Sequence, residues 1–323
     1  MSAPFLGAIL SIEFWQYVAV TAGIYSIFAL GLQLQFGFAG LLNFGHIGFM
    51  AIGSYTMAML IVHASLPMWI SAPIAIATAM LFGLIIGIPA LRLRADYLAI
   101  TTIAFSEIIR IFILNSVRWT GGPQGLLGFA TEYTDFSRSA GRRLSSITHI
   151  GFDPDRVLLV LVWPTVLLLY LVLRKLTRSP WGRVLRAIRE DEDAADALGK
   201  NPLAYKLQAL AIGSAFAAIA GIFFSYQLLY LTPTEFEPLF TFFAWVIVLL
   251  GGTARLGGVP VGAVIFAVIF AGTRFLEFWP LSLLDDGDRA AVRLIVVGLI
   301  LIGLMAFRPQ GIFGKKEELL LDR

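Results

Sequence analysis

Nine long apolar segments recur along the chain, and they constrain the fold more than any other feature. A helix needs roughly 20 apolar residues to cross the hydrocarbon core of a bilayer. Hydrophobic residues make up 58% of the chain and charged residues 14%, far from the composition of a soluble domain. The sequence therefore predicts an all-α polytopic membrane protein with about 8–10 transmembrane helices, in a single domain over residues 1–323. The segments are 14–36, 41–62, 68–91, 97–117, 156–174, 207–230, 239–252, 260–279 and 293–307.

The second segment is rich in glycine and carries polar side chains. Its stretch FGFAGLLNFGHIGFMAIGSYTMAML, residues 36–60, contains Asn43, Gly45, His46 and Gly48. Irregular backbone at membrane depth occurs only where protein or a water-filled cavity surrounds the freed polar groups. We therefore predict a broken helix here. The segment 239–252 is too short to cross a bilayer comfortably.

Lysine and arginine are unevenly distributed between the connections. They gather around Arg92 and Arg94, between Arg174 and Lys206, and after Arg308. Cytoplasmic connections carry an excess of these residues, so we predict that these three regions, including the C-terminus, face the cytoplasm. The segments predicted to face outside are a long loop over about 118–155 and the acidic stretches with Glu235, Glu237, Asp285, Asp286 and Asp288.

The connection over about 175–206 contains the signals of a short charged helix. Its stretch RSPWGRVLRAIREDEDAADALGKNPLAYK has Pro180 near the helix start, while Gly199 and Asn201-Pro202 end the helix. Alanines among the charges favour close docking in a groove of a partner. A solvated basic loop explains the same spacing equally well. The residues of the docking interpretation are Arg183, Arg186, Ala187, Asp193, Ala194, Ala195 and Gly199.

Two opposite charges stand inside the fourth segment. Glu107 and Arg110 are three residues apart and therefore share a helical face. Charges at this depth are costly unless they pair or face a polar interior. A structural ion pair is the favoured interpretation, and a gate or polar anchor beside a path through the membrane is the alternative.

Several classes of function find no residues to support them. The chain has no Walker A motif: Gly199-Lys200 is followed by Asn201 and not by Ser or Thr. It has no cysteine, and its three histidines fall in different segments, so we expect no metal site. No nucleophile and base converge, so we predict no enzyme and no cofactor. The net charge of +3 comes from residues beside apolar segments, which does not indicate nucleic-acid binding.

Several stretches, taken in order, resemble one family: the LivM-like membrane subunits of branched-chain (hydrophobic) amino-acid ABC importers. The resemblance covers about residues 20–314. It departs from the family in GGTARLGGVPVG, and Asp193 stands for the usual Glu of the "EAA…G" coupling signature. The matching stretches are LLNFGHIGFMAIGSYT, LRADYLAITTIAFSEIIRIFILN with TGGPQGL, SPWGRVLRAIREDEDAADALGKN, KLQALAIGSAFAAIAGIFFSY, PTEFEPLFTFFAWVIVLLGGTARLGGVPVGA and FRPQGIFG.

The resemblance implies a permease subunit in the bacterial inner membrane that works by alternating access. Its implied partners are a second, related permease, two cytoplasmic ATPase subunits and an external solute-binding protein. Importers of urea, short amides and other small polar solutes belong to the same superfamily. The main rival from another class is an ion-coupled secondary transporter, for which Glu107 is the best titratable candidate.

The resemblance also assigns roles to the residues singled out above. The helix from about Arg183 to Gly199 becomes the element that couples to the ATPase. The broken segment is expected to pack close to the transport path. There, Asn43 and His46 would hydrogen-bond freed carbonyls or the partner permease, with direct contact between His46 and the substrate as the alternative.

Overall fold

The computed structural model describes residues 11–148 and 151–274, together with residues 291, 292, 295, 298, 299, 302, 303 and 312. Six helices in this part are long and apolar enough to cross a membrane. They are α2 (Ile12–Gln33, continued by the π-helix η1, Leu34–Phe38), α3 (His46–Ala64), α4 (Met68–Ala90), α5 (Ala95–Asn115), α8 (Pro154–Arg178) and α11 (Pro202–Leu228). The shorter apolar helices are α12 (Leu239–Gly251) and α13 (Gly258–Arg274).

The prediction of an all-α polytopic membrane protein with short and broken helices is confirmed. The eighth predicted segment, 260–279, is described as far as residue 274. The ninth, 293–307, lies largely outside the described residues.

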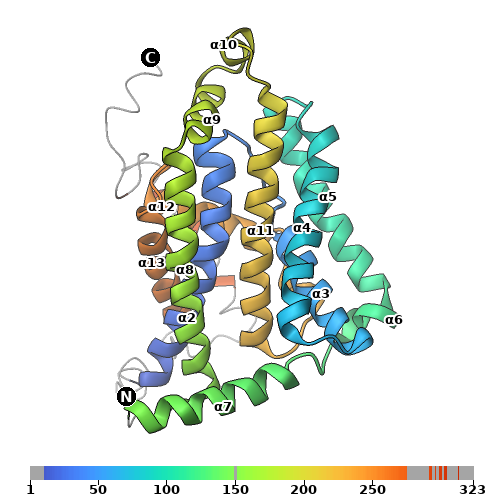
Figure 1. Ribbon diagram of the computed structural model, residues 1–323, viewed down its shortest axis with the longest axis vertical. Helices are drawn as coiled ribbons and strands as arrows, with labels where there is room; N and C mark the ends of the chain where they lie inside the picture. Colours follow the sequence, from blue (N-terminus) through green and yellow to red (C-terminus); the bar gives the residue numbers. More distant parts are fainter. Residues whose placement is uncertain are drawn as a thin grey trace.

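α2 and α11 form the centre of the bundle. α11 packs against α2, α3 and α4, and α2 also packs against α8 and α13 (Figure 1). Ile27 and Leu30 on α2 are fully buried, as expected for a helix that is apolar on all sides. The outer helices α4, α5 and α8 leave Leu81, Phe112 and Leu168 more than half exposed. Such apolar faces suit lipid or a neighbouring subunit.

The break after α2 lies at residues 39–45, before α3 begins. Gly48 and Gly53 lie inside α3 and leave it regular. A Cβ added to Gly45 would lie 1.8 Å from the carbonyl oxygen of Thr102 on α5, far inside any real contact distance. Gly45 therefore serves the close approach of two backbones. The glycine-rich pattern predicts the irregular segment, but it does not locate the break.

The predicted external loop over 118–155 is largely helical. α6 (Val117–Thr120) and the 3-10 turn η2 (Gly122–Gln124) lead into α7 (Thr131–Thr148), which lies across one end of the bundle (Figure 1). The ring of Tyr133 stacks on that of Tyr226, with centroids 4.3 Å apart, which fixes α7 to α11. The absence of a long apolar segment hides such a helix in the sequence, because its residues are polar and amphipathic.

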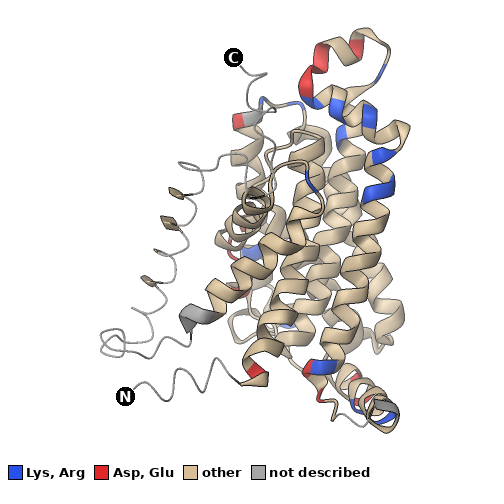
Figure 2. Ribbon diagram, turned by 90° about the vertical axis from the view of Figure 1, so that its left-hand side faces the viewer, with Lys and Arg blue, Asp and Glu red and all other residues tan. Residues whose placement is uncertain are grey.

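Lys and Arg concentrate at one end of the molecule (Figure 2). This basic end comprises the connection between α4 and α5, the end of α8, and two short helices, α9 (Pro180–Glu190) and α10 (Glu192–Ala197). The opposite end carries α6, α7 and the start of α8, where both signs of charge occur. The folded chain thus keeps the charge asymmetry that its sequence predicts between the two sides of a membrane.

Candidate functional site

The predicted charged helix between Pro180 and Gly199 is two helices. α9 ends at Glu190, and Asp191 has extended backbone with φ −152°. The side chain of Asp191 accepts a hydrogen bond from the backbone N–H of Ala194 at 2.9 Å, so it caps a new helix, α10. Gly199 follows with φ +74°, a left-handed conformation that glycine adopts without strain. The prediction of one continuous helix is wrong because an N-cap residue restarts it.

The predicted docking residues form an exposed projection at the basic end (Figure 1). α9 buries Leu185 and Ile188 against the bundle, so its outer side is free to meet a partner. Leu198, at the end of α10, is 80% exposed. Ala195 differs from the other predicted docking residues because it is buried within the chain. The exposed ones are Arg183, Arg186, Ala187, Asp193, Ala194 and Gly199.

α9 is attached to η1, which directly precedes the break. The guanidinium of Arg189 donates a hydrogen bond to the backbone carbonyl of Gly37. The guanidinium of Arg186 lies 5.8 Å from the centre of the Phe38 ring, a cation–π contact. Both contacts join α9 to η1, and π-helical segments of this kind recur at functional sites. Arg186 was among the predicted docking residues, whereas Arg189, three residues further along the same helix, was not.

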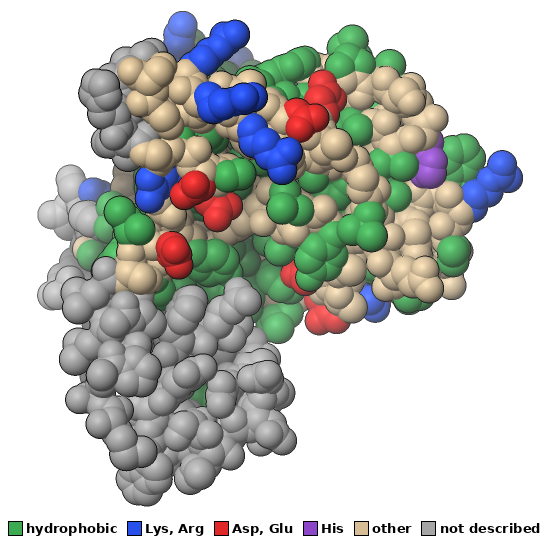
Figure 3. Space-filling model, turned by 90° about the horizontal axis from the view of Figure 1, so that it is seen from below, with side chains coloured by type: hydrophobic (Ala, Val, Ile, Leu, Met, Phe, Trp, Pro, Cys, Tyr) green, Lys and Arg blue, Asp and Glu red, His purple; other side chains and the backbone are tan. Residues whose placement is uncertain are grey.

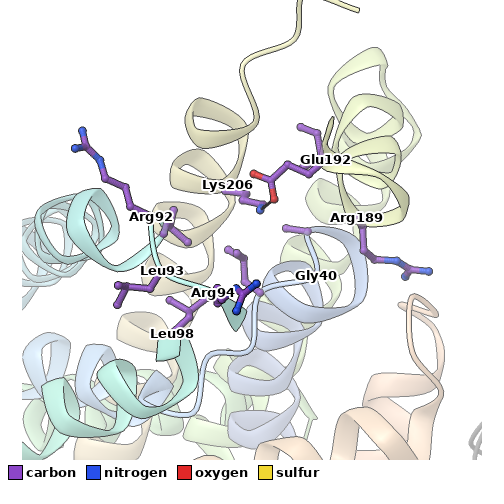
Figure 4. A pocket seen from close by; sticks show the side chains of 12 residues that line it. Gly40, Arg92, Leu93, Arg94, Leu98, Arg189, Glu192 and Lys206 are labelled. Atoms are coloured by element: carbon purple, nitrogen blue, oxygen red, sulfur yellow. Dashed lines mark hydrogen bonds and ion pairs between the residues drawn. The ribbon is translucent and has the colours of Figure 1, made fainter. Parts of the chain in front are cut away.

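A cavity of about 420 Å³ opens between α9, the break and the connection from α4 to α5. Figure 4 shows Glu192 and Lys206 pointing toward each other across its upper side, where they form an ion pair. The basic residues outnumber the single carboxylate in its lining. They are Arg92, Arg94, Arg189 and Lys206. Figure 4 shows the guanidinium groups of Arg92 and Arg189 pointing away from the cavity. The cavity was not predicted because its residues are distant in the sequence.

The N-termini of α3 and α12 meet inside the bundle. The backbone N–H of Ile47 donates to Oγ1 of Thr241 at 3.1 Å, and Nε1 of Trp245 donates to the carbonyl of Asn43 at 3.2 Å. The Phe44 ring stacks on that of Trp245, with centroids 4.8 Å apart. The membrane-length helix α3 and the shorter helix α12 therefore begin at one point of the interior, as in transporters built from discontinuous helices.

Asn43 is the centre of a buried hydrogen-bond network at this point. Its Nδ2 donates to Oε1 of Gln35 at 2.8 Å, and its Oδ1 accepts from the backbone N–H of Gly45 at 2.9 Å. Nε2 of Gln35 in turn donates to the carbonyl of Leu210 on α11 at 3.1 Å. The side chain of Asn43 thus satisfies the backbone N–H of Gly45, one of the freed groups of the break, as a buried irregular segment requires.

Replacing Asn43 by alanine is expected to destabilise the protein by about 2 kcal/mol or more, because it leaves buried polar groups of Gln35 and Gly45 unpaired. Thermal unfolding of the detergent-solubilised protein measures this. The matched control is Asn115→Ala, since Asn115 is exposed and bonds only to the carbonyl of Ile111 within the described residues. Equal midpoints for the two variants would contradict the network's role.

His46 is the first residue of α3 and lies beside this network, whereas the predicted ion pair lies on α5. His46 is fully buried, and its Nε2 lies 3.2 Å from the carbonyl oxygen of Phe28 on α2. Arg110 binds the carboxylate of Glu107 in a bidentate pair, with Nε–Oε2 2.9 Å and Nη2–Oε1 2.5 Å. Arg110 and Glu107 have side chains that are 20% and 34% exposed on α5, and neither lines the cavity at the basic end. The pairing leaves the Glu107 carboxylate already neutralised by a neighbouring charge.

A metal centre finds no support in the described part of the chain, where no group of three His, Asp or Glu residues converges. His149 lies outside the described residues. The arrangement as a whole joins an exposed projection at the basic end to a broken helix in the interior.

The chain matches a known protein family over most of its length. The family model for the permease component of the branched-chain amino acid transport system matches residues 15–305. The chain belongs to this permease family. The permease is 36% identical over 306 residues to the high-affinity branched-chain amino acid transport system permease protein LivM of Escherichia coli K12, covering 91% of the permease and 69% of that protein.

Two further relatives match the permease over almost the whole length of both chains. The probable branched-chain amino acid transport permease protein LivM of Methanocaldococcus jannaschii is 25% identical to the permease over 342 residues, 95% of each chain. The LivH permease protein of Salmonella typhimurium is 26% identical over 315 residues, 92% of the permease and 94% of that protein. The resemblance to LivM-like permeases predicted from the sequence is confirmed, and the permease is a multi-pass membrane protein of a transport system.

Proposed function

We propose that the permease is a membrane subunit of an ATP-binding-cassette importer that carries branched-chain amino acids across the bacterial inner membrane. The substrate class follows from the family and from the names of the relatives. The basic end faces the cytoplasm in this proposal, because Lys and Arg concentrate there. The C-terminus faces the same side because the sequence carries Arg308, Lys315 and Lys316 near it. ATP hydrolysis belongs to partner subunits, since the chain carries no Walker A sequence.

The attachment of α9 to η1, directly before the break, is the observation that carries the proposal. An ATPase that binds α9 and α10 moves Arg189 and Arg186, which hold Gly37 and Phe38. The same chain continues through Asn43 to the start of α3. Closing the ATPase pair would thus displace the point where α3 and α12 meet, which is the kind of rocking that alternating access needs.

The partner proposal has separate support. The exposed projection of α9 and α10 is the surface for one of two ATPase subunits. A second permease of LivH type would pack on the apolar outer helices, where Phe112 on α5 is 66% exposed. An external solute-binding protein would deliver the substrate to the opposite end. In this arrangement selectivity is shared between that protein and the path through the membrane.

The docking surface is tested by Leu198→Glu, which places a charge on an apolar side chain that is 80% exposed. We expect the ATPase subunits to be lost on co-purification and uptake of L-leucine to fall about 10-fold or more, because anchor residues of interfaces contribute about 2 kcal/mol or more. Both are measured with the complete importer, in detergent and in proteoliposomes.

The matched control is Leu127→Glu, at a leucine that is 66% exposed at the opposite end. It should retain the ATPase subunits. Equal retention in both variants would overturn the docking assignment. Uptake that follows an ion gradient without ATP would instead establish a secondary transporter. Ala195 is unsuitable for this test because it is buried in the chain itself.

A further inference from the structure

A second, larger cavity opens at the opposite end of the permease. It encloses about 780 Å³ between the first half of α2, the start of α8, the end of α11, the 3-10 turn η3 (Pro233–Phe236) and α13. Figure 3 shows this face, where carboxylates and hydrophobic side chains gather around a hollow. The volume lies in the range of small-molecule sites. Neither the sequence nor the coupling arrangement accounts for it.

The charged residues that line this cavity are all acidic among the residues that the structure describes. Glu13, Asp153 and Asp155 are exposed at its rim, whereas Glu235 on η3 is half-buried. No lysine or arginine of the described chain joins the lining. The cavity therefore carries a negative potential that draws cations in from the surrounding water.

Glu235 lacks a partner for its charge. Its carboxylate forms no hydrogen bond or ion pair with any described residue, and burial, with Glu237 as a second cause, raises the pKa of its carboxyl above the usual value. A half-buried carboxylate without a cation is costly. A positively charged ligand group at this carboxylate would remove that cost.

Aromatic side chains form the rest of the wall. Tyr25 lines the cavity and is only 7% exposed, yet its hydroxyl forms no hydrogen bond with a described residue. The hydroxyl is therefore free to bind a polar ligand group. Aromatic faces both attract ammonium groups and pack against aliphatic chains. The other aromatic residues of the lining are Tyr17, Phe224, Tyr230, Phe240 and Phe270.

We propose that this cavity receives the amino acid before it crosses the membrane, with Glu235 binding its α-ammonium group, Tyr25 its carboxylate and the aromatic wall its aliphatic side chain. The proposal rests on the proposed function, because it takes the substrate class and the outward orientation from there. It adds a substrate site within the permease itself, on the side where a binding protein would release its ligand.

The absence of cysteine from the sequence permits a direct test of binding. Gln227→Cys places a single thiol in the cavity wall, and Leu127→Cys places one outside it. In the complete importer, L-leucine should slow maleimide labelling at residue 227 and not at residue 127. Isoamylamine, which keeps the ammonium group, should also protect, whereas 4-methylpentanoate, which lacks it, should not.

Glu235→Gln and Tyr25→Phe then test the two contacts without a change of size. Each should weaken protection by L-leucine about 10-fold or more in concentration, because each removes a hydrogen bond to a charged group. Asp135→Asn, at an exposed carboxylate on α7 outside the cavity, should leave protection nearly unchanged.

The two levels of the proposal fail separately. If the unmodified importer does not take up L-leucine with ATP, the proposed function is wrong. If it does, but L-leucine fails to protect residue 227, or protects it equally in the Glu235→Gln variant, the cavity is not the substrate site. Protection by 4-methylpentanoate equal to that by L-leucine would also overturn the role of Glu235.

Discussion

Gly45→Ala is expected to prevent the permease from accumulating in folded form. The added Cβ would lie 1.8 Å from the carbonyl oxygen of Thr102, which is backbone and cannot move aside alone. α3 and α5 would have to separate, and the hydrogen bond from the backbone N–H of Phe44 to Oγ1 of Thr102 would be lost. We expect a loss of about 3 kcal/mol or more. Fluorescence size-exclusion chromatography and thermal unfolding of the solubilised protein measure it.

Gly257→Ala is the matched control for this substitution. Its added Cβ would have the hydroxyl of Tyr170 as nearest neighbour, at 3.8 Å, an ordinary contact. That variant should be as abundant and as stable as the unmodified permease. A Gly45→Ala variant with the same unfolding midpoint would show that the two helices are not held at this distance.

Arg189→Ala is expected to uncouple ATP hydrolysis from transport while the permease stays folded and bound to its ATPase. The substitution removes the hydrogen bond to the carbonyl of Gly37, which joins α9 to η1, directly before the break. Hydrogen bonds from charged groups contribute about 1.5–3 kcal/mol, so uptake per ATP hydrolysed should fall about 10-fold or more. The ratio of L-leucine taken up to phosphate released, in proteoliposomes, reports the effect.

Lys175→Ala provides the control of equal charge. Lys175 is exposed near the end of α8 at the basic end, away from the break. Its loss should leave the ratio of uptake to hydrolysis unchanged. If both variants transport equally well, the contact between α9 and Gly37 does not transmit the movement of the ATPase subunits to the interior. Retained ATPase binding in the Arg189→Ala variant separates uncoupling from lost assembly.

The helices α9 and α10 show which local features the sequence predicts and which it does not. The boundaries at Pro180 and at Gly199 follow from local backbone preferences, so they could be predicted. The interruption between α9 and α10 at Asp191 was not predicted, although it has a local cause: the Asp191 side chain caps the next helix. The burial of Ala195 could not be predicted, because it depends on how α10 folds back on the chain.

The broken segment shows the same division. Its glycines and its polar Asn43 predict irregular backbone in the interior, because such residues in an apolar segment need protein around them. They do not predict that Gly45 packs against Thr102, or that Asn43 hydrogen-bonds with Gln35 and Trp245. Those contacts join residues up to about 200 apart in the chain, and no local pattern encodes them.

By itself the sequence determined the class of fold, the family and the distribution of charge between the two ends, because the length of apolar segments and the ordered motifs are properties of the chain alone. Only the tertiary structure decided which helices and side chains contact one another. Packing brought Arg189 onto Gly37, the start of α3 onto α12, and Glu235 with Tyr25 into one cavity. Each of these pairings depends on helices that are distant in the sequence and meet in space. The contacts that connect α9 through η1 to the interior therefore exist only in the folded protein.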